Sequence, residues 1–142
     1  MKKGKVDKDF WNSKKVFLTG HTGFKGSWLT IFLNLLGAKI YGYSLKPDKV
    51  SLFKKADCHK IVKKNFFCDI RDKKKLKEAL KQSRPEVIFH FAAQALVKTS
   101  YEKPYDTFST NILGTLNILT LSQNLKNLKS VIISTTDKVY KL

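Results

Sequence analysis

Residues 16–30 read VFLTGHTGFKGSWLT, in which three glycines spaced three positions apart separate two apolar runs. The run before the glycines, within residues 14–20, is rich in β-branched and aromatic residues, which is typical of a strand. From residue 25 onward, apolar residues recur at helical spacing, which predicts a helix. The pattern T-G-x-x-G-x-x-G therefore joins a predicted strand to a predicted helix, where bare backbone can approach a bound phosphate.

Each glycine of this turn has its own expected task. Gly20 permits a tight turn, Gly23 lets a pyrophosphate approach the main chain, and Gly26 lets the helix pack close to the strand. The N–H groups and the dipole at the start of the helix favour the phosphate charge. Glycine-rich turns also arise for structural reasons alone, but the flanking strand and helix favour dinucleotide binding here.

Strands and helices alternate along the rest of the chain. Further strands are expected over residues 38–45, 65–70, 86–93 and 129–135. Further helices are expected over residues 71–83 and 104–125, the latter with an apolar stripe of Phe108, Ile112, Leu116 and Leu119. This alternation predicts the α/β class, a Rossmann-type doubly wound parallel sheet with right-handed crossovers and strand order 3-2-1-4-5.

The composition is that of one globular domain, with 142 residues of which 42% are hydrophobic and 27% charged. Residues 1–13 are interpreted as a basic lead-in and residues 14–142 as the domain. No apolar run approaches the length of a membrane span, and the first residues lack the apolar core of a secretory signal. A cytoplasmic protein with no membrane partner is therefore expected.

The formal net charge of +17 makes nucleic acid a candidate partner. Only Arg71 and Arg84 among the 28 basic residues are arginine, although arginine is the side chain best shaped for bidentate phosphate and guanine contacts. No recognition motif surrounds the lysines. A lysine-rich surface is therefore favoured over a specific nucleic-acid site.

The cysteines and histidines predict no metal site. Cys58 and Cys68 lack paired C-x-x-C spacing and are interpreted as reduced, structural thiols. His21, inside the glycine turn, is expected either to border a ligand or to bond a backbone group. His90, in the middle of a predicted strand, is interpreted as a core histidine with its hydrogen bonds satisfied.

Several segments resemble one family. The spacing T-G-x-x-G-x-x-G is similar to that of the extended short-chain dehydrogenase/reductase superfamily, which includes nucleotide-sugar epimerases and dehydratases. Residues 10–29 (FWNSKKVFLTGHTGFKGSWL), 89–104 (FHFAAQALVKTSYEKP) and 135–140 (TTDKVY) together resemble the CDP-glucose 4,6-dehydratase family. The Phe-Lys pair between the second and third glycines and Lys138 distinguish this family, because dTDP-glucose dehydratases carry an acid at the latter position.

The resemblance implies an NAD site. Its cofactor-binding residues would be Gly20, Thr22, Gly23, Phe24, Gly26, Asp69, Ile70, Ala92, Ala93 and Gln94. Asp69 and Ile70 match the acidic segment that contacts adenine, and residues 90–94 match the strand end beside the nicotinamide. NADP stays open, because no acid ends the second predicted strand to hold the ribose 2′-hydroxyl, and Lys46 or Lys49 could meet a 2′-phosphate.

The resemblance also implies a reaction, in which NAD takes hydride from C4 of a hexose, water leaves across C5 and C6, and hydride returns to C6. Thr136 matches the residue that hydrogen-bonds the C4 oxygen. Asp137 matches the acid that protonates the departing hydroxyl, which requires a raised pKa. Lys138 replaces a glutamate and can help remove the C5 proton only with a lowered pKa. On the residues alone, this stretch could equally be a polar turn that leaves a strand.

The hydride step of the superfamily uses a tyrosine followed four residues later by a lysine, and none of the five tyrosines here has that neighbour. The chain is therefore interpreted as an amino-terminal part, inactive alone and lacking the sixth strand and the substrate-binding region. The whole enzyme is expected to take CDP-glucose and to form a homodimer. Two alternatives remain: another epimerase or reductase of the superfamily, or a non-catalytic dinucleotide-fold protein that binds an anionic partner.

Overall fold

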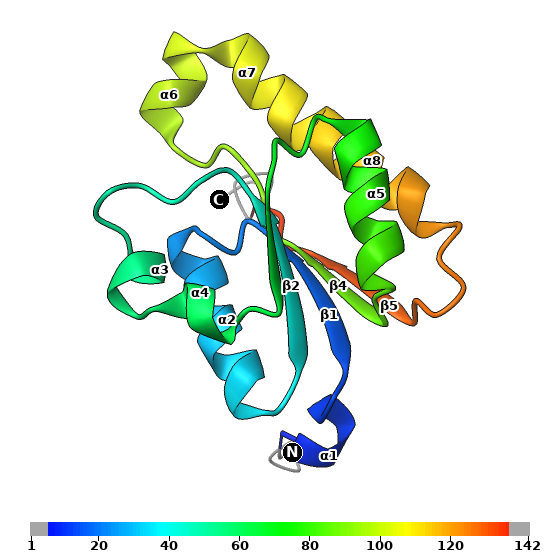
Figure 1. Ribbon diagram of the computed structural model, residues 1–142. Helices are drawn as coiled ribbons and strands as arrows, with labels where there is room; N and C mark the ends of the chain where they lie inside the picture. Colours follow the sequence, from blue (N-terminus) through cyan, green and yellow to red (C-terminus); the bar gives the residue numbers. More distant parts are fainter. Residues whose placement is uncertain (1–5, 137–142) are drawn as a thin grey trace, which may run out of the picture.

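Residues 6–136 of the chain are described by the computed structural model, in which helices cover both faces of one parallel sheet (Figure 1). The five strands in this range are β1 (Lys15–Thr19), β2 (Lys39–Ser44), β3 (Lys64–Phe67), β4 (Val87–His90) and β5 (Ser130–Ile133). Their order in the sheet is β3-β2-β1-β4-β5, and every pairing is parallel. The predicted Rossmann-type topology is confirmed.

The helices form two layers. On one face lie α2 (Phe24–Leu35), α3 (Leu52–Lys55) and α4 (Cys58–Ile61), and on the other lie α5 (Lys73–Ser83) and α8 (Gly114–Ser122). Between β4 and α8 the chain forms α6 (Val97–Glu102), α7 (Pro104–Phe108) and a π-helical turn, η1 (Ser109–Leu113). The short helix α1 (Lys8–Trp11) precedes β1, within the predicted lead-in.

Strand β1 lies at the centre of the core because its side chains alternate between two apolar clusters. Val16 and Leu18 are fully buried with Leu33 of α2. Phe17, also fully buried, packs on the opposite face with Ile88 and Ile118. A strand covered on both faces reads as a continuous apolar run, which is what the sequence displays.

Three strands end at least two residues before their predicted carboxyl ends, and one of them is β5, which was predicted over residues 129–135 and stops at Ile133. The strand predicted over residues 65–70 stops at Phe67, and the one predicted over residues 86–93 stops at His90. After His90, the Phe91 N–H is shared between the carbonyl oxygen and the hydroxyl of Thr19, at 3.2 and 3.1 Å, and the Ala92 N–H donates to the same hydroxyl at 3.1 Å, where the pairing with β1 ends. A side chain, and not a Gly or Pro, ends this strand.

The helix predicted over residues 104–125 is three segments, and its predicted apolar stripe faces outward. Phe108, Ile112, Leu116 and Leu119 are 43–64% exposed. The buried face carries Gly114, Ile118 and Ser122 instead. Gly114 is required there because a Cβ would lie 2.7 Å from Cγ2 of Ile70. Helical periodicity correctly identified an apolar face of this helix. It could not show that a different face, formed mostly by small residues, packs against the rest of the protein.

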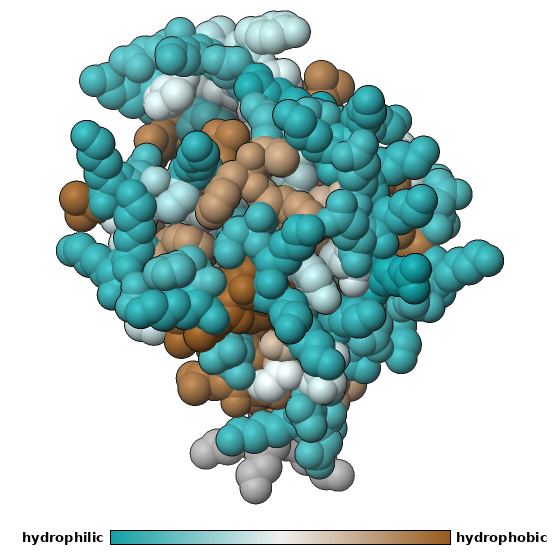
Figure 2. Space-filling view, in the orientation of Figure 1, coloured by the Kyte–Doolittle hydropathy of each residue, from teal (hydrophilic) through white to brown (hydrophobic). Residues whose placement is uncertain are grey.

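Polar side chains cover most of the face shown in Figure 2, with hydrophobic residues showing around the position of α2. Helix α2 carries an outward stripe of its own, composed of Phe24, Trp28, Phe32 and Leu35. Within residues 6–136, no helix combines the length and apolarity needed to cross a membrane.

Candidate functional site

The glycine turn lies at the carboxyl edge of the sheet, between β1 and α2. Gly20 has a φ of +72°, and a Cβ there would lie 2.7 Å from the carbonyl carbon of Phe91. A Cβ on Gly26 would overlap the carbonyl oxygen of Gly20. The protein's own packing therefore requires glycine at both positions. Gly20 leaves room for the tight turn and for the loop after β4, and Gly26 lets α2 approach the turn.

Gly23 differs from the other two glycines. Its φ of −74° suits any residue, and a Cβ there would meet only the Gly20 carbonyl oxygen, at 3.3 Å. Nothing else in the described chain lies within 4 Å, so the space over Gly23 is open. A glycine that the fold does not need marks a place where something outside the fold can approach the backbone.

The start of α2 offers unused donors beside Gly23. Within residues 6–136, the main-chain N–H groups of Phe24, Lys25 and Gly26 donate to no acceptor, whereas Ser27 donates to the Gly23 carbonyl from both its N–H and its hydroxyl. The helix has 12 residues, so its dipole adds positive potential at this end. The turn and the first helical turn together suit an anionic group.

Thr22 ties the glycine turn to the end of β2. Its hydroxyl lies 3.1 Å from the Leu45 carbonyl oxygen and 2.7 Å from the Ser44 hydroxyl. Because a carbonyl only accepts, Thr22 donates to Leu45 and the Ser44 hydroxyl donates to Thr22. The hydroxyl proton of Ser44 is therefore already used in a hydrogen bond, but the Ser44 oxygen can still accept hydrogen bonds from a ligand.

A smaller hollow of about 150 Å³ opens beyond the ends of β2 and β3. Its lining includes Asp69 and Ile70, the predicted acidic segment, together with Ser44, Ala92 and Ala93. Arg71 holds the Asp69 carboxylate through two nitrogens, at 3.0 and 2.7 Å, and keeps the pKa of Asp69 below its usual range. Asp69 is therefore ionised and paired, a partnership that sequence spacing did not predict.

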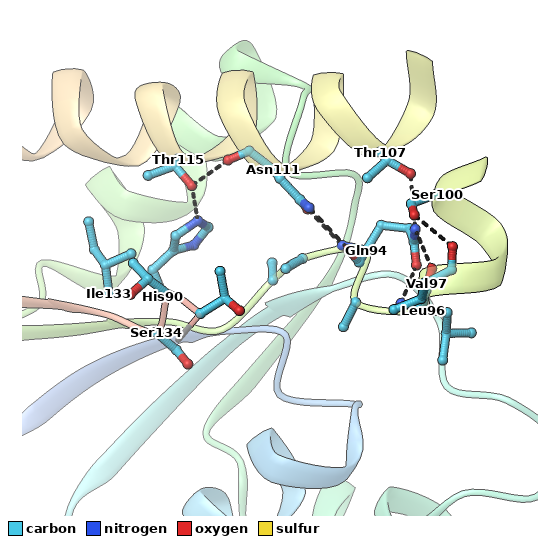
Figure 3. A pocket seen from close by; sticks show the side chains of 15 residues that line it. His90, Gln94, Leu96, Val97, Ser100, Thr107, Asn111, Thr115, Ile133 and Ser134 are labelled. Carbon is cyan, nitrogen blue, oxygen red and sulfur yellow. Dashed lines mark hydrogen bonds between the residues drawn. The ribbon is translucent and has the colours of Figure 1, made fainter. Parts of the chain in front are cut away.

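A larger hollow of about 680 Å³ lies beyond β4 and β5 (Figure 3). Ala92 and Ala93 line both hollows, so the loop after β4 is their shared wall. This loop lies where β1 and β4 are neighbours and the strand order reverses after the crossover from β3 to β4, the topological switch point at which ligands bind in open α/β sheets.

Gln94 and Asn111 fix the loop after β4 against the π-helical turn η1. The Gln94 N–H donates to Oδ1 of Asn111 at 2.8 Å, and Nδ2 of Asn111 donates to the Gln94 carbonyl oxygen at 3.0 Å (Figure 3). The Gln94 side chain donates to Thr107 at 2.9 Å. Gln94 therefore shapes the hollow through its main chain, while its side chain is engaged by α7.

A chain of hydrogen bonds runs from the glycine turn through His90 to η1. The Thr19 hydroxyl accepts from two N–H groups, so its own proton points to Nδ1 of His90, 2.7 Å away. Nε2 of His90 then carries the ring proton and donates to the Thr115 hydroxyl at 3.0 Å, which donates to the Asn111 carbonyl oxygen at 2.7 Å. Burial lowers the pKa of His90 to about 4, in agreement with a neutral ring. The expected core histidine is confirmed, and it also links β1 to α8.

His21 lines neither hollow at the carboxyl edge, and the backbone of Tyr43 is among its hydrogen-bonding neighbours. It is fully buried, and its ring packs on Gly42, where a Cβ would overlap it. Nε2 lies 2.9 Å from Oδ1 of Asn65, and burial lowers the His21 pKa to about 4. His21 points away from the space over Gly23 and holds β1, β2 and β3 together.

Of the three predicted catalytic residues, one is the last residue of the described range and two lie beyond it. Thr136 lines the larger hollow together with Ser134 and Thr135. Asp137 and Lys138 lie outside the described residues. Thr19 and Thr115 were missed by the sequence reasoning. The feature that identifies them is a hydroxyl on each side of the His90 ring. This arrangement cannot be recognised from the sequence, because it exists only when β1, β4 and α8 are adjacent.

Comparison with known proteins agrees with this geometry. The sheet order and the glycine turn define the Rossmann-type domain that nucleotide-sugar dehydratases and epimerases share. The chain belongs to the GDP-mannose 4,6 dehydratase family, whose sequence profile matches residues 17–140. The resemblance to CDP-glucose 4,6-dehydratases is confirmed by 45% identity over 136 residues with the protein of that name from Salmonella typhimurium, covering 95% of this chain and 38% of that one.

Solved structures show the same fold. An epimerase from Methanothermobacter thermautotrophicus matches with a TM-score of 0.77 and 27% identity, over 95% of this chain and 39% of that one. UDP-glucose 4-epimerase from Thermus thermophilus, solved in complex with NAD, matches with a TM-score of 0.69 and 31% identity, over 84% of this chain and 37% of that one. The chain thus spans less than two fifths of the length of these relatives.

Proposed function

We propose that residues 14–136 bind an NAD-type dinucleotide along the carboxyl edge of the sheet and form the cofactor-binding part of a nucleotide-sugar 4,6-dehydratase. The observation that carries the proposal is the open space over Gly23, flanked by unused helix N–H groups. The pyrophosphate would lie there, the adenosine half toward the smaller hollow and the nicotinamide half toward the larger one, on either side of Ala92 and Ala93. When bound, the cofactor would accept and return hydride.

The hydrogen bonds at the end of β2 favour NAD over NADP. Ser44 has given its only proton to Thr22, so its oxygen can accept from a ribose 2′-hydroxyl but cannot donate to a 2′-phosphate. Lys46 and Lys49 follow in the loop and could still attract the phosphate. NAD is the cofactor we propose, with NADP weaker.

CDP-glucose is the proposed substrate of the whole enzyme. The support is the identity with the Salmonella typhimurium CDP-glucose 4,6-dehydratase. In this proposal Thr136 in the larger hollow hydrogen-bonds the C4 oxygen of the sugar, and Asp137 and Lys138 supply acid and base. Residues 14–136 by themselves would turn over no sugar nucleotide, because none of Tyr41, Tyr43, Tyr101 and Tyr105 has a lysine four residues on.

A chimera tests the proposed function. The Salmonella typhimurium enzyme, with its amino-terminal segment replaced by residues 10–136 of this chain, should convert CDP-glucose to a 4-keto sugar, detected by its absorbance in alkali. The chimera with Gly23→Val should fold and lose this activity. A folded chimera that binds NAD but dehydrates a different sugar nucleotide in preference would contradict the substrate proposal.

A further inference from the structure

The edge of the sheet opposite the proposed dinucleotide site carries a third hollow, of about 430 Å³. We call it the amino-edge hollow, and it is lined by Lys15, Arg84, Glu86, Lys126, Asn127, Leu128 and Lys129. These residues surround the amino ends of β1, β4 and β5, where the end of α5 and the turn before β5 come together (Figure 1). Four of the seven lining residues are cationic.

Glu86 is the single acid of the lining, and it is already engaged. Its carboxylate accepts from Nζ of Lys14 at 3.1 Å and from the N–H of Lys15 at 3.2 Å, and Nζ of Lys129 lies 3.8 Å away. These groups hold the pKa of Glu86 below its usual range, the Lys15 N–H most strongly. Glu86 therefore fixes the floor of the hollow, but one carboxylate cannot neutralise Lys14, Lys15, Arg84, Lys126 and Lys129 together.

Arg84 is held in place by its backbone. Its φ of +45° is uncommon for a residue with a side chain, and its N–H caps α5 by donating to the Leu80 carbonyl oxygen at 3.0 Å, with Pro85 following. Within residues 6–136 the Arg84 guanidinium forms no hydrogen bond and no ion pair, whereas the guanidinium of Arg71 is shared by Asp69 and Asp106. Arg84 thus presents an exposed guanidinium at the rim, available to a ligand.

We propose that the amino-edge hollow binds a polyphosphate anion, a run of two or more linked phosphates. Several cations converging on one concave site match several charges on one ligand, whereas a single carboxylate or phosphate would use only one or two of them. None of the lining residues is aromatic, and single-stranded nucleic acid is held by bases stacked on aromatic rings. The ligand is therefore recognised by its phosphates, with no base bound.

The test is a calorimetric titration of the chain with inorganic tripolyphosphate and with orthophosphate, at low salt and at physiological salt. Tripolyphosphate should bind at least about tenfold more tightly than orthophosphate, and its affinity should fall as salt rises. The double variant Arg84→Asn with Lys129→Gln should bind tripolyphosphate at least about tenfold more weakly, because it removes two positive charges from the hollow. Asparagine is chosen at position 84 because it tolerates a positive φ.

The matched control is Lys54→Gln with Lys55→Gln on α3, which removes the same two charges elsewhere on the surface. It should leave tripolyphosphate affinity within about twofold of the wild type. Equal weakening in both double variants would overturn the proposal, because diffuse charge and not the hollow would then carry binding. NAD titration of the Arg84 and Lys129 variant should be unchanged, since the two edges are separate.

Three further ligands, namely ATP, AMP and a single-stranded RNA, identify the source of the phosphates. With NAD present at a saturating concentration to occupy the carboxyl edge, ATP should bind as tightly as tripolyphosphate if only the phosphates are recognised, and AMP should bind no better than orthophosphate. A single-stranded RNA that binds more tightly than tripolyphosphate, and loses that affinity in the Arg84 and Lys129 variant, would overturn the proposal in favour of a nucleic-acid surface.

Discussion

The two edges of the sheet use different chemistry. At the carboxyl edge, polar groups such as Thr19, His90 and Thr115 are joined in one hydrogen-bonded chain around a backbone left bare by glycine. At the amino edge, charged and largely exposed side chains surround Glu86. We therefore expect the first edge to select a ligand by shape and by hydrogen-bond direction, and the second to select by charge. Variants at the carboxyl edge should change the stability of the protein and its affinity for the dinucleotide. Variants at the amino edge should change the salt-dependent binding of anions.

The largest effect is expected at Gly26, where the packing of the carboxyl edge leaves no room. Gly26→Ala should lower the free energy of unfolding by about 3 kcal/mol or more, because the new Cβ would overlap the Gly20 carbonyl oxygen and press on the His21 Cα. Urea unfolding measures the loss. Gly23→Ala is the control and should cost less than about 1 kcal/mol, and equal losses at both positions would contradict the division of tasks between the glycines.

The next largest effect is expected from acidification, which should lower the stability of the fold through the buried histidines of the carboxyl edge. Folding lowers the pKa values of His21 and His90 from 6.5 to about 4, so between these values the unfolded chain binds more protons. Stability should therefore fall as pH drops from about 6.5 toward 4. His90→Gln should flatten part of this fall in thermal unfolding scans across that range. A midpoint that does not change between pH 7 and pH 4.5 would contradict the buried, neutral assignment.

A smaller effect is expected on cofactor choice. Thr22→Val removes the acceptor of the Ser44 proton, so Ser44 becomes able to donate to a 2′-phosphate. The ratio of NADP to NAD affinity, measured by calorimetric titration, should rise about threefold to tenfold. Ser27→Ala serves as a control because it removes a neighbouring hydroxyl that bonds only the turn's own carbonyls. A ratio unchanged by Thr22→Val would show that Ser44 does not choose the cofactor.

The smallest effect is expected from the backbone of Arg84, on the other edge. Arg84→Gly should raise stability by up to about 1 kcal/mol, because glycine adopts a positive φ without strain. Thermal unfolding should detect the rise, and Lys81→Gly, inside α5, should destabilise instead. Loss of stability in Arg84→Gly would mean that the guanidinium supports the fold rather than standing ready for a ligand.

The sheet order was predictable from the sequence because alternating strands and helices with right-handed crossovers permit few topologies. The tasks of Gly20 and Gly26 also follow from local geometry, since one needs a positive φ and the other a close approach of helix to turn. What could not be predicted depends on groups distant in the sequence. His21 is buried against Gly42, and β4 ends at the Thr19 hydroxyl, more than seventy residues earlier.

The candidate site was only partly predictable for a related reason. Ala92 and Ala93 do line both hollows, but Asp69 is held by Arg71 and the Gln94 side chain is engaged by α7, and neither pairing follows from spacing. The outward stripe through Phe108 shows the limit of periodicity, which finds an apolar face without telling what covers it.

The most direct test of the proposed dinucleotide site is calorimetric titration of NAD into the wild-type chain and into Gly23→Val. The backbone of Gly23, at φ −74° and ψ 171°, accepts valine, and a Cβ there meets only one atom of the protein, so the variant should fold as the wild type does. NAD should bind to the wild type, and no binding should be detectable in Gly23→Val, whose unfolding midpoint should be unchanged. Equal NAD affinity in the two proteins would contradict the proposed site.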